Sequence, residues 1–216
     1  MSWIVERRTT PRGELVLRRD GAHFEIISNG VFLMDTRGGE SERLLVSAPL
    51  DGRTRPARVL VGGLGVGFSV AEALRHPMTS DVTVVEVEPA VIDWQRRYLA
   101  SCSGDALDNP RVRVVCADLL DWLDWLDEGD ERYDVICIDI DNGPQWTVMD
   151  RNASLYMGDG LALLVSRLAP DGTLAVWSAS DDEAFYQRLA VAFGNPRRHL
   201  VPVERGEPDV VYLAGN

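Results

Sequence analysis

The strongest constraint on the fold is an apolar run that leads into four closely spaced glycines. Residues 59–67 read Val-Leu-Val-Gly-Gly-Leu-Gly-Val-Gly, and a second apolar run, 82–85, is followed at once by Glu86. Glycines let the chain turn sharply after a strand and approach a ligand closely, and a carboxylate after the next strand can accept hydrogen bonds from two ribose hydroxyls. The pattern predicts a nucleoside site at the carboxyl ends of the strands.

The spacing of the glycines narrows the choice of nucleoside. A dinucleotide fingerprint needs a glycine three residues after its second glycine, but Phe68 stands three residues after Gly65. A P-loop needs Gly-Lys-Ser/Thr, whereas all 22 basic residues of this chain are Arg. What remains is the Gly-x-Gly-x-Gly spacing of Gly63, Gly65 and Gly67, the loop type used for S-adenosylmethionine and its relatives.

The amino-terminal part of the chain, residues 1–50, is predicted to be a small β-strand domain. Alternating apolar residues predict strands at 14–18, 23–28 and 31–35, and the turn sequences Asp-Gly and Asn-Gly between them make a meander of two hairpins. A short helix over 40–48 is expected to complete this part.

Residues 58–216, after a polar linker at 51–57, are predicted to form an α/β domain. Strands alternate with helices, which implies a Rossmann-like, mostly parallel seven-stranded sheet with helices on both faces. The predicted strands lie at 59–61, 82–86, 112–115, 135–140, 173–177, 200–203 and 210–213. The predicted helices lie at 68–75, 90–99, 119–126 and 161–168, and a Ser180-x-x-Glu183 capping box begins one that ends near Gly194.

The composition limits the possible partners. A net charge of −12 and a pI near 4.7 argue against nucleic acid, because phosphate backbones attract clustered positive charge. No apolar run reaches the length of a membrane span, and we expect a cytoplasmic protein. Cys102, Cys116 and Cys137 lack metal-ligand spacing and are expected to be core thiols. Neither they nor the three histidines predict a metal site.

Acidic residues follow the predicted strands, at the edge where such sheets bind ligands. Asp118 could accept from an adenine amino group, or it could only cap the helix that follows it. Glu88 is expected to be a first-turn helix acid that interacts with the helix dipole. Asp139 and Asp141 alternate along their predicted strand, so one of them should face the site, and Asp139 is the expected base.

These residues stand in the order found in the spermidine synthase family, the polyamine aminopropyltransferases, which the chain resembles over nearly all its length. The segment Gly62-Gly63-Leu64-Gly65-Val66-Gly67 is similar to the family's Gly-Gly-Gly-Asp-Gly-Gly loop. Glu86-Val87-Glu88 is similar to its Glu-Ile-Asp, and Asp139-Ile140-Asp141-Asn142 to its Asp-x-x-Asp-Pro. The resemblance implies a fold like that of class I S-adenosylmethionine-dependent methyltransferases, and a homodimer.

The resemblance also implies an activity, the transfer of an aminopropyl group from decarboxylated S-adenosylmethionine to an amine acceptor without a metal. The nucleoside-binding residues would be Gly62, Gly63, Gly65, Gly67, Glu86, Val87, Asp118 and Leu119. Asp139 and Asp141 would be catalytic, with Asp139 as the base. The acceptor site would include Asn142, Trp146 and Trp177.

The chain departs from the family where the donor tail and the acceptor are contacted. Gly65 replaces the loop aspartate, Asn142 stands at the last position of the fourth motif, and Trp177 replaces a glutamine. Ser41-Glu42-Arg43 replaces Tyr-His-Glu, and the cation of Arg43 would repel a diamine but suit a donor that keeps its carboxylate. Two alternatives therefore stay open, a methyltransferase that uses intact S-adenosylmethionine and a degenerate, non-catalytic nucleoside-binding homologue.

Overall fold

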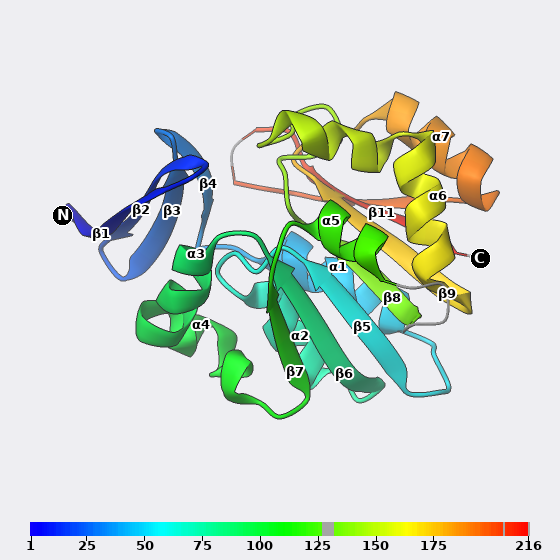
Figure 1. Cartoon of the computed structure of the whole chain (residues 1–216), viewed down its shortest axis with the longest axis horizontal. Coiled ribbons are helices and arrows are strands. Elements are labelled where there is room, and N and C mark those ends of the chain that lie inside the picture. Colours follow the sequence, from blue (N-terminus) through cyan, green and yellow to red (C-terminus); the bar gives the residue numbers. More distant parts are fainter. Residues whose placement is uncertain (127–131, 205, 216) are drawn as a thin grey trace.

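Two β-sheets form the framework of this computed structural model, which describes residues 1–126, 132–204 and 206–215 (Figure 1). Residues 127–131, 205 and 216 of the predicted α/β domain lie outside the described residues. The amino-terminal sheet is antiparallel and consists of β1 Ser2–Thr10, β2 Gly13–Asp20, β3 His23–Ser28 and β4 Val31–Asp35, in that order. The meander has three hairpins rather than two. β1 was not predicted because it is an edge strand with mostly exposed side chains, which gives it little apolar alternation.

The second sheet has seven strands in the order β10-β11-β9-β8-β5-β6-β7. They are β5 Ala57–Gly62, β6 Thr79–Glu86, β7 Val112–Cys116, β8 Tyr133–Ile138, β9 Leu168–Ser178, β10 Arg197–Val201 and β11 Asp209–Gly215. Strands β5 to β9 pair in parallel, and β11 runs antiparallel to both its neighbours. The predicted Rossmann-like, mostly parallel seven-stranded sheet and the separate amino-terminal β-strand part are confirmed.

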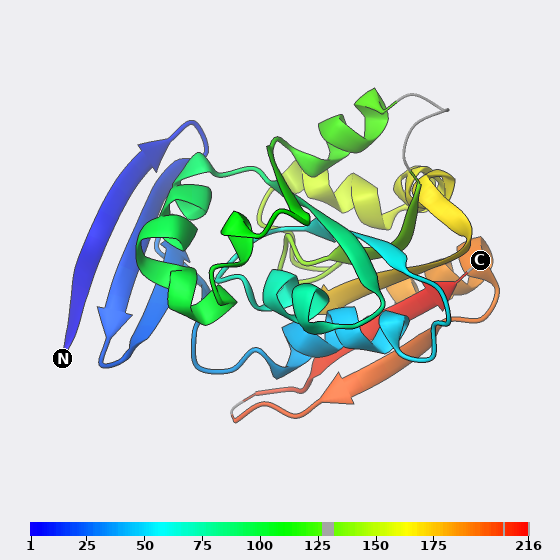
Figure 2. The same cartoon turned by 90° about the horizontal axis from the view of Figure 1, so that it is seen from below.

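Helices cover both faces of this sheet (Figures 1 and 2). One face carries α1 Glu40–Leu50 and α2 Phe68–Arg75, and the other carries α5 Leu119–Trp125, α6 Gly158–Arg167 and α7 Glu183–Phe193. Strand β5 is apolar from Val59 to Val61 because it faces both layers. Val59 and Val61 belong to the core under α1 and α2, while Leu60 belongs to the core under α5, α6 and α7.

Helix α1 continues to Leu50, past its predicted end, although Pro49 lies inside it. Proline has no N–H, so the carbonyl oxygen of Leu45, four residues earlier, lacks its helical donor. The Cys137 thiol on β8 donates to that oxygen instead, at 3.4 Å. Helix α1, which was predicted as part of the amino-terminal domain, is therefore hydrogen-bonded to β8, the central strand of the seven-stranded sheet.

Two other helices differ from their predictions. The helix expected over 90–99 is α3 Pro89–Trp94, which leads into a π-helical turn, Gln95–Leu99, and α4 Ala100–Ser103. The predicted capping box is wrong, because α7 begins after Asp182, whose carboxylate accepts from the Phe185 N–H at 3.0 Å. Short 3₁₀ segments are found at Ala106–Asp108 and Asp150–Tyr156.

The cysteine prediction holds for one residue of the three. Cys137 is buried, Cys102 is half-buried, and Cys116 is exposed at the end of β7, an edge strand. In the described part of the chain, no helix is both long and apolar enough to cross a membrane.

Candidate active site

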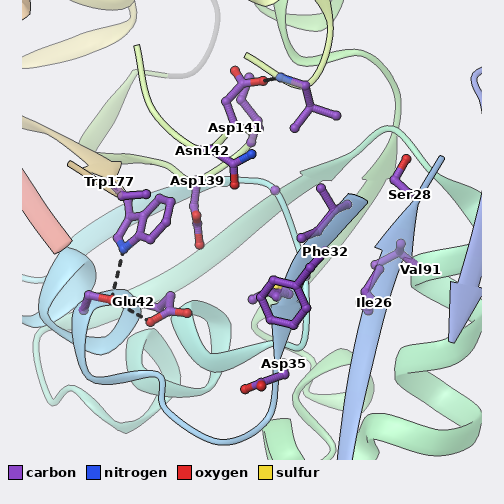
Figure 3. A pocket seen from close by; sticks show the side chains of 18 of the residues that line it. Ile26, Ser28, Phe32, Asp35, Glu42, Val91, Asp139, Asp141, Asn142 and Trp177 are labelled. Atoms are coloured by element: carbon purple, nitrogen blue, oxygen red, sulfur yellow. Dashed lines mark hydrogen bonds between the residues drawn. The ribbon is translucent and has the colours of Figure 1, made fainter. Parts of the chain in front are cut away.

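A cavity of about 980 Å³ lies at the carboxyl ends of the parallel strands and is walled by both sheets (Figure 3). The amino-terminal sheet contributes Ile26, Phe32 and Met34 to its lining. The α/β domain contributes the residues that follow β5, β6, β7 and β8, together with the start of α1 and the start of β11. Six of the eight predicted nucleoside positions and two of the three predicted acceptor positions therefore open into one cavity.

Two close contacts shape the glycine loop after β5. Gly63 has a φ of +92°, and a Cβ there would lie 2.1 Å from the main-chain oxygen of Asp139. Gly65 has a φ of +49°, and a Cβ there would lie 2.2 Å from the sulfur of Met34. The same sulfur accepts a hydrogen bond from the Val66 N–H at 3.2 Å. Strand β4 thus fills the space beside the loop where an acidic side chain at position 65 would stand.

Glu86, at the end of β6, is buried beside this loop and lines the cavity. Its Oε2 accepts from the Leu64 N–H at 2.9 Å, and its Oε1 accepts from the Glu88 N–H at 2.8 Å. Burial raises the pKa of the Glu86 carboxyl, although these main-chain donors act against the rise. A carboxylate has further lone pairs beyond these two, so Glu86 can fasten the glycine loop and still accept from ribose hydroxyls.

Asp118 follows β7 and lines the cavity, as do Val87 and Leu119. Its Oδ1 accepts from the main-chain N–H groups of Leu120 and Asp121 at 3.0 and 3.3 Å. The alternative that Asp118 caps the following helix is therefore confirmed. Its other oxygen, Oδ2, lies 3.4 Å from the guanidinium of Arg151, so the role of Asp118 toward an adenine amino group stays a prediction.

Glu88 immediately precedes α3, but its carboxylate makes no capping hydrogen bond to that helix. Oε1 lies 3.3 Å from the hydroxyl of Thr10 and 3.5 Å from the guanidinium of Arg12, both in the amino-terminal sheet. Glu88 is thus the N-cap residue of α3 rather than a first-turn residue, and its carboxylate joins the two sheets at the edge of the cavity.

Asp139 is the first residue after β8, which ends two residues before its predicted end. Its side chain points into the cavity (Figure 3). Among the described residues, none forms a hydrogen bond or an ion pair with this carboxylate. Burial, followed by the nearby carboxylates of Glu42 and Asp209, raises the pKa of Asp139 well above its usual value. Such a group accepts a proton far more readily than a solvated aspartate does.

Asp141 is buried and fully engaged with protein groups. Its Oδ1 accepts from the Val148 N–H at 2.6 Å and from the Asn152 amide at 2.9 Å, and its Oδ2 accepts from the Tyr156 hydroxyl at 2.9 Å. Burial raises the pKa of Asp141, and these donors act against the rise. The geometry makes Asp141 the anchor of the loop after β8, whereas Asp139 is the carboxylate that remains available.

A group of polar residues lies next to Asp139, and one of its members, Asp209, was not predicted as a site residue. Ser41 Oγ is 2.9 Å from Glu42 Oε2 and 2.7 Å from Asp209 Oδ2, and it accepts from Trp177 Nε1 at 3.0 Å. Figure 3 shows Trp177, Asp139 and Glu42 on the same side of the cavity. Burial raises the pKa values of both Glu42 and Asp209. Asp209 could have been found from the direction of its strand, because the first residue of an antiparallel strand lies at the edge where its parallel neighbours end.

The chain is similar in sequence to known polyamine aminopropyltransferases. The model of the spermine/spermidine synthase domain matches residues 40–189, more than half of the chain. The chain belongs to the spermine/spermidine synthase family. The polyamine aminopropyltransferase of Mycobacterium tuberculosis (strain ATCC 25618 / H37Rv) is 32% identical over 179 residues, which cover 82% of this chain and 33% of that protein. Polyamine aminopropyltransferase 1 of Streptomyces coelicolor is 36% identical over 126 residues, 57% of this chain and 22% of that protein.

Solved structures of the same family share the fold. A spermidine synthase in complex with the transition state analogue AdoDATO superposes with a TM-score of 0.83 at 19% identity, covering 98% of this chain and 73% of that chain. The spermidine synthase from Thermotoga maritima gives 0.81 at 19% identity, covering 98% and 72%. The chain spans about a third of the length of the M. tuberculosis relative.

Several predicted site residues of this spermine/spermidine synthase family member lie elsewhere. Trp146 is 62% exposed and is not part of the cavity lining, whereas Asn142 and Trp177 are. Gly62 and Gly67 also lie outside the lining, since Gly62 is the last residue of β5 and Gly67 precedes α2. The predicted binding role of Trp146 has no support in this arrangement, because its side chain is exposed to solvent outside the cavity.

The expected repulsion by Arg43 is also wrong. Its guanidinium lies 4.5 Å from the centre of the Phe68 ring and donates to the Gly38 carbonyl oxygen at 3.3 Å, outside the cavity lining. The neighbouring residue Glu42 faces the cavity instead. The helix therefore presents a carboxylate, not a cation, to the site.

Proposed function

We propose that the protein transfers an aminopropyl group from decarboxylated S-adenosylmethionine to an amine acceptor. The observation that carries the proposal is the unpaired Asp139 carboxylate, which stands between the glycine loop with Glu86 and the carboxylates of Glu42 and Asp209. The names of the relatives, polyamine aminopropyltransferase and spermidine synthase, and the transition state analogue bound to one of them support the same reaction.

In this reaction the nitrogen of the acceptor attacks the carbon next to the sulfonium. The new N–C bond forms as the C–S bond breaks, the bonding electrons stay on sulfur, and the products are the alkylated amine and neutral methylthioadenosine. Asp139 takes the proton from the attacking ammonium, and Glu86 and the glycine loop hold the nucleoside so that nitrogen, carbon and sulfur are in line. Asp141 keeps the loop that carries Asp139 and Asn142 in place.

The charges of the cavity favour the decarboxylated donor over intact S-adenosylmethionine. Intact S-adenosylmethionine has a carboxylate on its tail, which would lie among the carboxylates of Asp139, Glu42 and Asp209, and like charges repel strongly away from water. Arg43, which could have balanced a donor carboxylate, is turned away toward Phe68. The arginines that line the cavity, Arg12 and Arg37, are paired with the carboxylates of Glu88 and Glu25. An ammonium-bearing tail meets no such conflict.

Side-by-side assays with the two donors test the proposal. The purified protein is incubated with a panel of amines and either donor, and release of methylthioadenosine or S-adenosylhomocysteine is measured. We expect methylthioadenosine alone, and a rate about 10² to 10⁴ lower in Asp139→Asn. Asp124→Asn, an exposed carboxylate on α5, is the matched control and should be fully active. Methyl transfer from the intact donor would support a methyltransferase, and nucleoside binding without turnover would support a non-catalytic homologue.

We also expect a homodimer, in keeping with the resemblance to the family. The amino-terminal sheet leaves four large apolar side chains exposed, namely Trp3, Ile4, Val31 and Phe32. A sheet of this size needs a partner surface for such residues. A strictly monomeric mass by light scattering at micromolar concentration would contradict this expectation.

A further inference from the structure

Two side chains are hydrogen-bonded to opposite ends of a single peptide group in the glycine loop. Gln95 Nε2 donates to the carbonyl oxygen of Gly65 at 3.1 Å. The sulfur of Met34 accepts from the next N–H, that of Val66, at 3.2 Å. The carbonyl oxygen and the N–H of a trans peptide point in opposite directions, so these two contacts fix the plane of this peptide from both sides. Met34 comes from β4 and Gln95 from the π-helical turn, so neither belongs to the loop itself.

The Gln95 side chain is enclosed by the protein, and packing alone does not explain an amide at this position. Its exposed fraction is 1%. Its Oε1 is buried and has no hydrogen-bond partner among the described residues, so the contact of Nε2 with the Gly65 oxygen stands against an unsatisfied polar atom. An unsatisfied buried oxygen lowers stability, which an apolar side chain of the same size would avoid. Gln95 also begins a π-helical turn, a rare element that is frequent at functional sites.

Gly67, the last glycine of the Gly-x-Gly-x-Gly spacing, makes room for Gln95. It has a φ of +89°, and a Cβ there would lie 2.8 Å from Gln95 Nε2 and 2.7 Å from the Cβ of Ser103. Gly63 and Gly65 line the cavity, whereas Gly67 does not. The close approach that Gly67 permits is therefore to side chains of the protein, and not to a ligand in the cavity.

We infer that Gln95 is a positioning residue for nucleoside binding, which orders the glycine loop through the Gly65 carbonyl oxygen from outside the cavity lining. Glu86 fixes the same loop at the Leu64 N–H, and Gln95 and Met34 fix the peptide after Gly65. Glycine loses more conformational freedom on ordering than any other residue, and a loop that is ordered in advance costs less to bind. The inference rests on the proposed function for the assignment of this loop to the nucleoside.

Calorimetry with methylthioadenosine tests the inference without turnover. Gln95→Met keeps the length of the side chain but cannot donate to Gly65, so the affinity should fall about 10-fold. In steady state the same variant should raise the KM for the donor about 10-fold with little change in kcat. Gln187→Met is the matched control and should bind as the wild type does, because Gln187 lies exposed on α7, where it donates to Glu183.

Hydrogen exchange of the Val66 amide, followed by nuclear magnetic resonance, reports on the loop directly. In the free protein this amide should exchange faster in Gln95→Met than in the wild type, because the peptide has lost one of its two contacts. At saturation with methylthioadenosine the two proteins should exchange alike. A packing role for Gln95 would instead lower the free energy of unfolding and leave both the affinity and the exchange of Val66 unchanged.

A second variant, Gln95→Glu, separates hydrogen bonding from packing through its pH dependence. A protonated carboxyl can donate to the Gly65 carbonyl oxygen, whereas an ionised carboxylate only accepts and repels that oxygen. The affinity of Gln95→Glu divided by that of the wild type should therefore be close to one at acidic pH. It should fall as the pH rises through the pKa of the introduced carboxyl, which burial raises. The same ratio for Gln95→Met should not change with pH.

The results separate this inference from the proposed reaction. An unchanged affinity in Gln95→Met, or a ratio for Gln95→Glu that does not depend on pH, would overturn the inference even if the wild type transfers the aminopropyl group. If Gln95→Met does not fold, Gln95→Glu at acidic and at neutral pH makes the comparison within one variant. A wild type that binds no methylthioadenosine would overturn both the inference and the reaction. Binding that depends on Gln95 without transfer of any group would leave the inference standing and refute the proposed reaction.

Discussion

The sulfur of Met34 lies 3.2 Å from the main-chain nitrogen of Val66 and accepts its hydrogen bond. Met34 belongs to the amino-terminal sheet and Val66 to the glycine loop of the α/β domain, so this thioether is one of the contacts that join the two parts at the cavity. It also occupies the space that any side chain at position 65 would need. Gly65, which replaces the family's loop acid, and Met34 therefore depend on each other, because a side chain at position 65 would clash with the Met34 sulfur.

This arrangement predicts a specific coupling between positions 34 and 65. Gly65→Ala should lose about 1–2 kcal/mol for the left-handed backbone and a further 1–3 kcal/mol, approximately, for the contact with Met34. In a Met34→Ala background only the backbone cost should remain. Gly63→Ala is the matched comparison, because its Cβ would meet a main-chain oxygen, and Met34→Ala should not relieve it. Urea unfolding of the two double-mutant cycles measures both couplings, and equal values would contradict the assigned contact.

A second prediction concerns Glu86. Glu86→Gln keeps the shape of the side chain but removes the charge that strengthens hydrogen bonds to ribose hydroxyls, so the affinity for methylthioadenosine should fall about 10- to 100-fold. Glu88→Gln is the matched control, since its carboxylate is directed toward Thr10 and Arg12. Isothermal titration measures both affinities. An unchanged affinity in Glu86→Gln would remove Glu86 from the nucleoside site.

Much of the α/β domain could be predicted from the sequence, because its parallel strands are buried on both faces and end in recognisable turns. The limits of α2 and of β3 and β4 agree with their predictions at both ends. The failures have local causes. β1 carries little apolar alternation, and the end of α1 depends on a hydrogen bond from a thiol that lies 92 residues after its acceptor in the chain. No local pattern contains that contact.

The residues of the candidate site that directly follow a single strand could be predicted from the sequence. Residues after β5, β6 and β8 could be assigned because strand ends in parallel sheets bind ligands. Glu42 and Asp209 could not be assigned in the same way, since they meet only when α1 and the carboxyl-terminal hairpin pack together. Arg43 was misassigned for a similar reason. One residue's step along a helix turns a side chain by about 100°, which directs Glu42 into the cavity and Arg43 out of it.

A third prediction separates the two aspartates after β8. Tyr156→Phe removes the hydroxyl that donates to Asp141 Oδ2 and should cost about 1.5–3 kcal/mol of unfolding free energy, because a buried carboxylate loses a donor. Tyr186→Phe, whose hydroxyl donates to the Pro196 carbonyl oxygen, should cost only about 0.5–1.5 kcal/mol. Asp141→Asn should also be less stable, yet reduce transfer less than Asp139→Asn does. Denaturant unfolding and initial rates measure these effects, and an essential Asp141 beside a dispensable Asp139 would reverse the assignment.

The last prediction is that Asp139, the proposed base, lowers the free energy of unfolding as the pH rises above about 4. The pKa of Asp139 is raised in the folded protein by burial and then by Glu42 and Asp209, whereas in the unfolded chain it returns to about 4. Below that pH the side chain is protonated in both states and contributes no difference. As the pH rises above about 4, the unfolded chain ionises first, so the free energy of unfolding falls by at most about 1.4 kcal/mol per pH unit for this group until the folded pKa is reached.

Asn at position 139 has no proton to lose. Comparing the stability of Asp139→Asn with that of the wild type therefore isolates the effect of the Asp139 titration. The stability of Asp139→Asn minus that of the wild type, both without ligand, should grow as the pH rises from about 4 and then level off above the folded pKa. Urea unfolding at a series of pH values measures the difference, and Asp124→Asn, an exposed carboxylate, controls for the loss of one negative charge. A difference that is flat or shrinks with pH would mean that the pKa of Asp139 is not raised in the folded protein. Asp139→Asn should therefore be more stable than the wild type at neutral pH and should no longer transfer the aminopropyl group. The Asp139 carboxylate, which has no partner among the described residues, causes both effects.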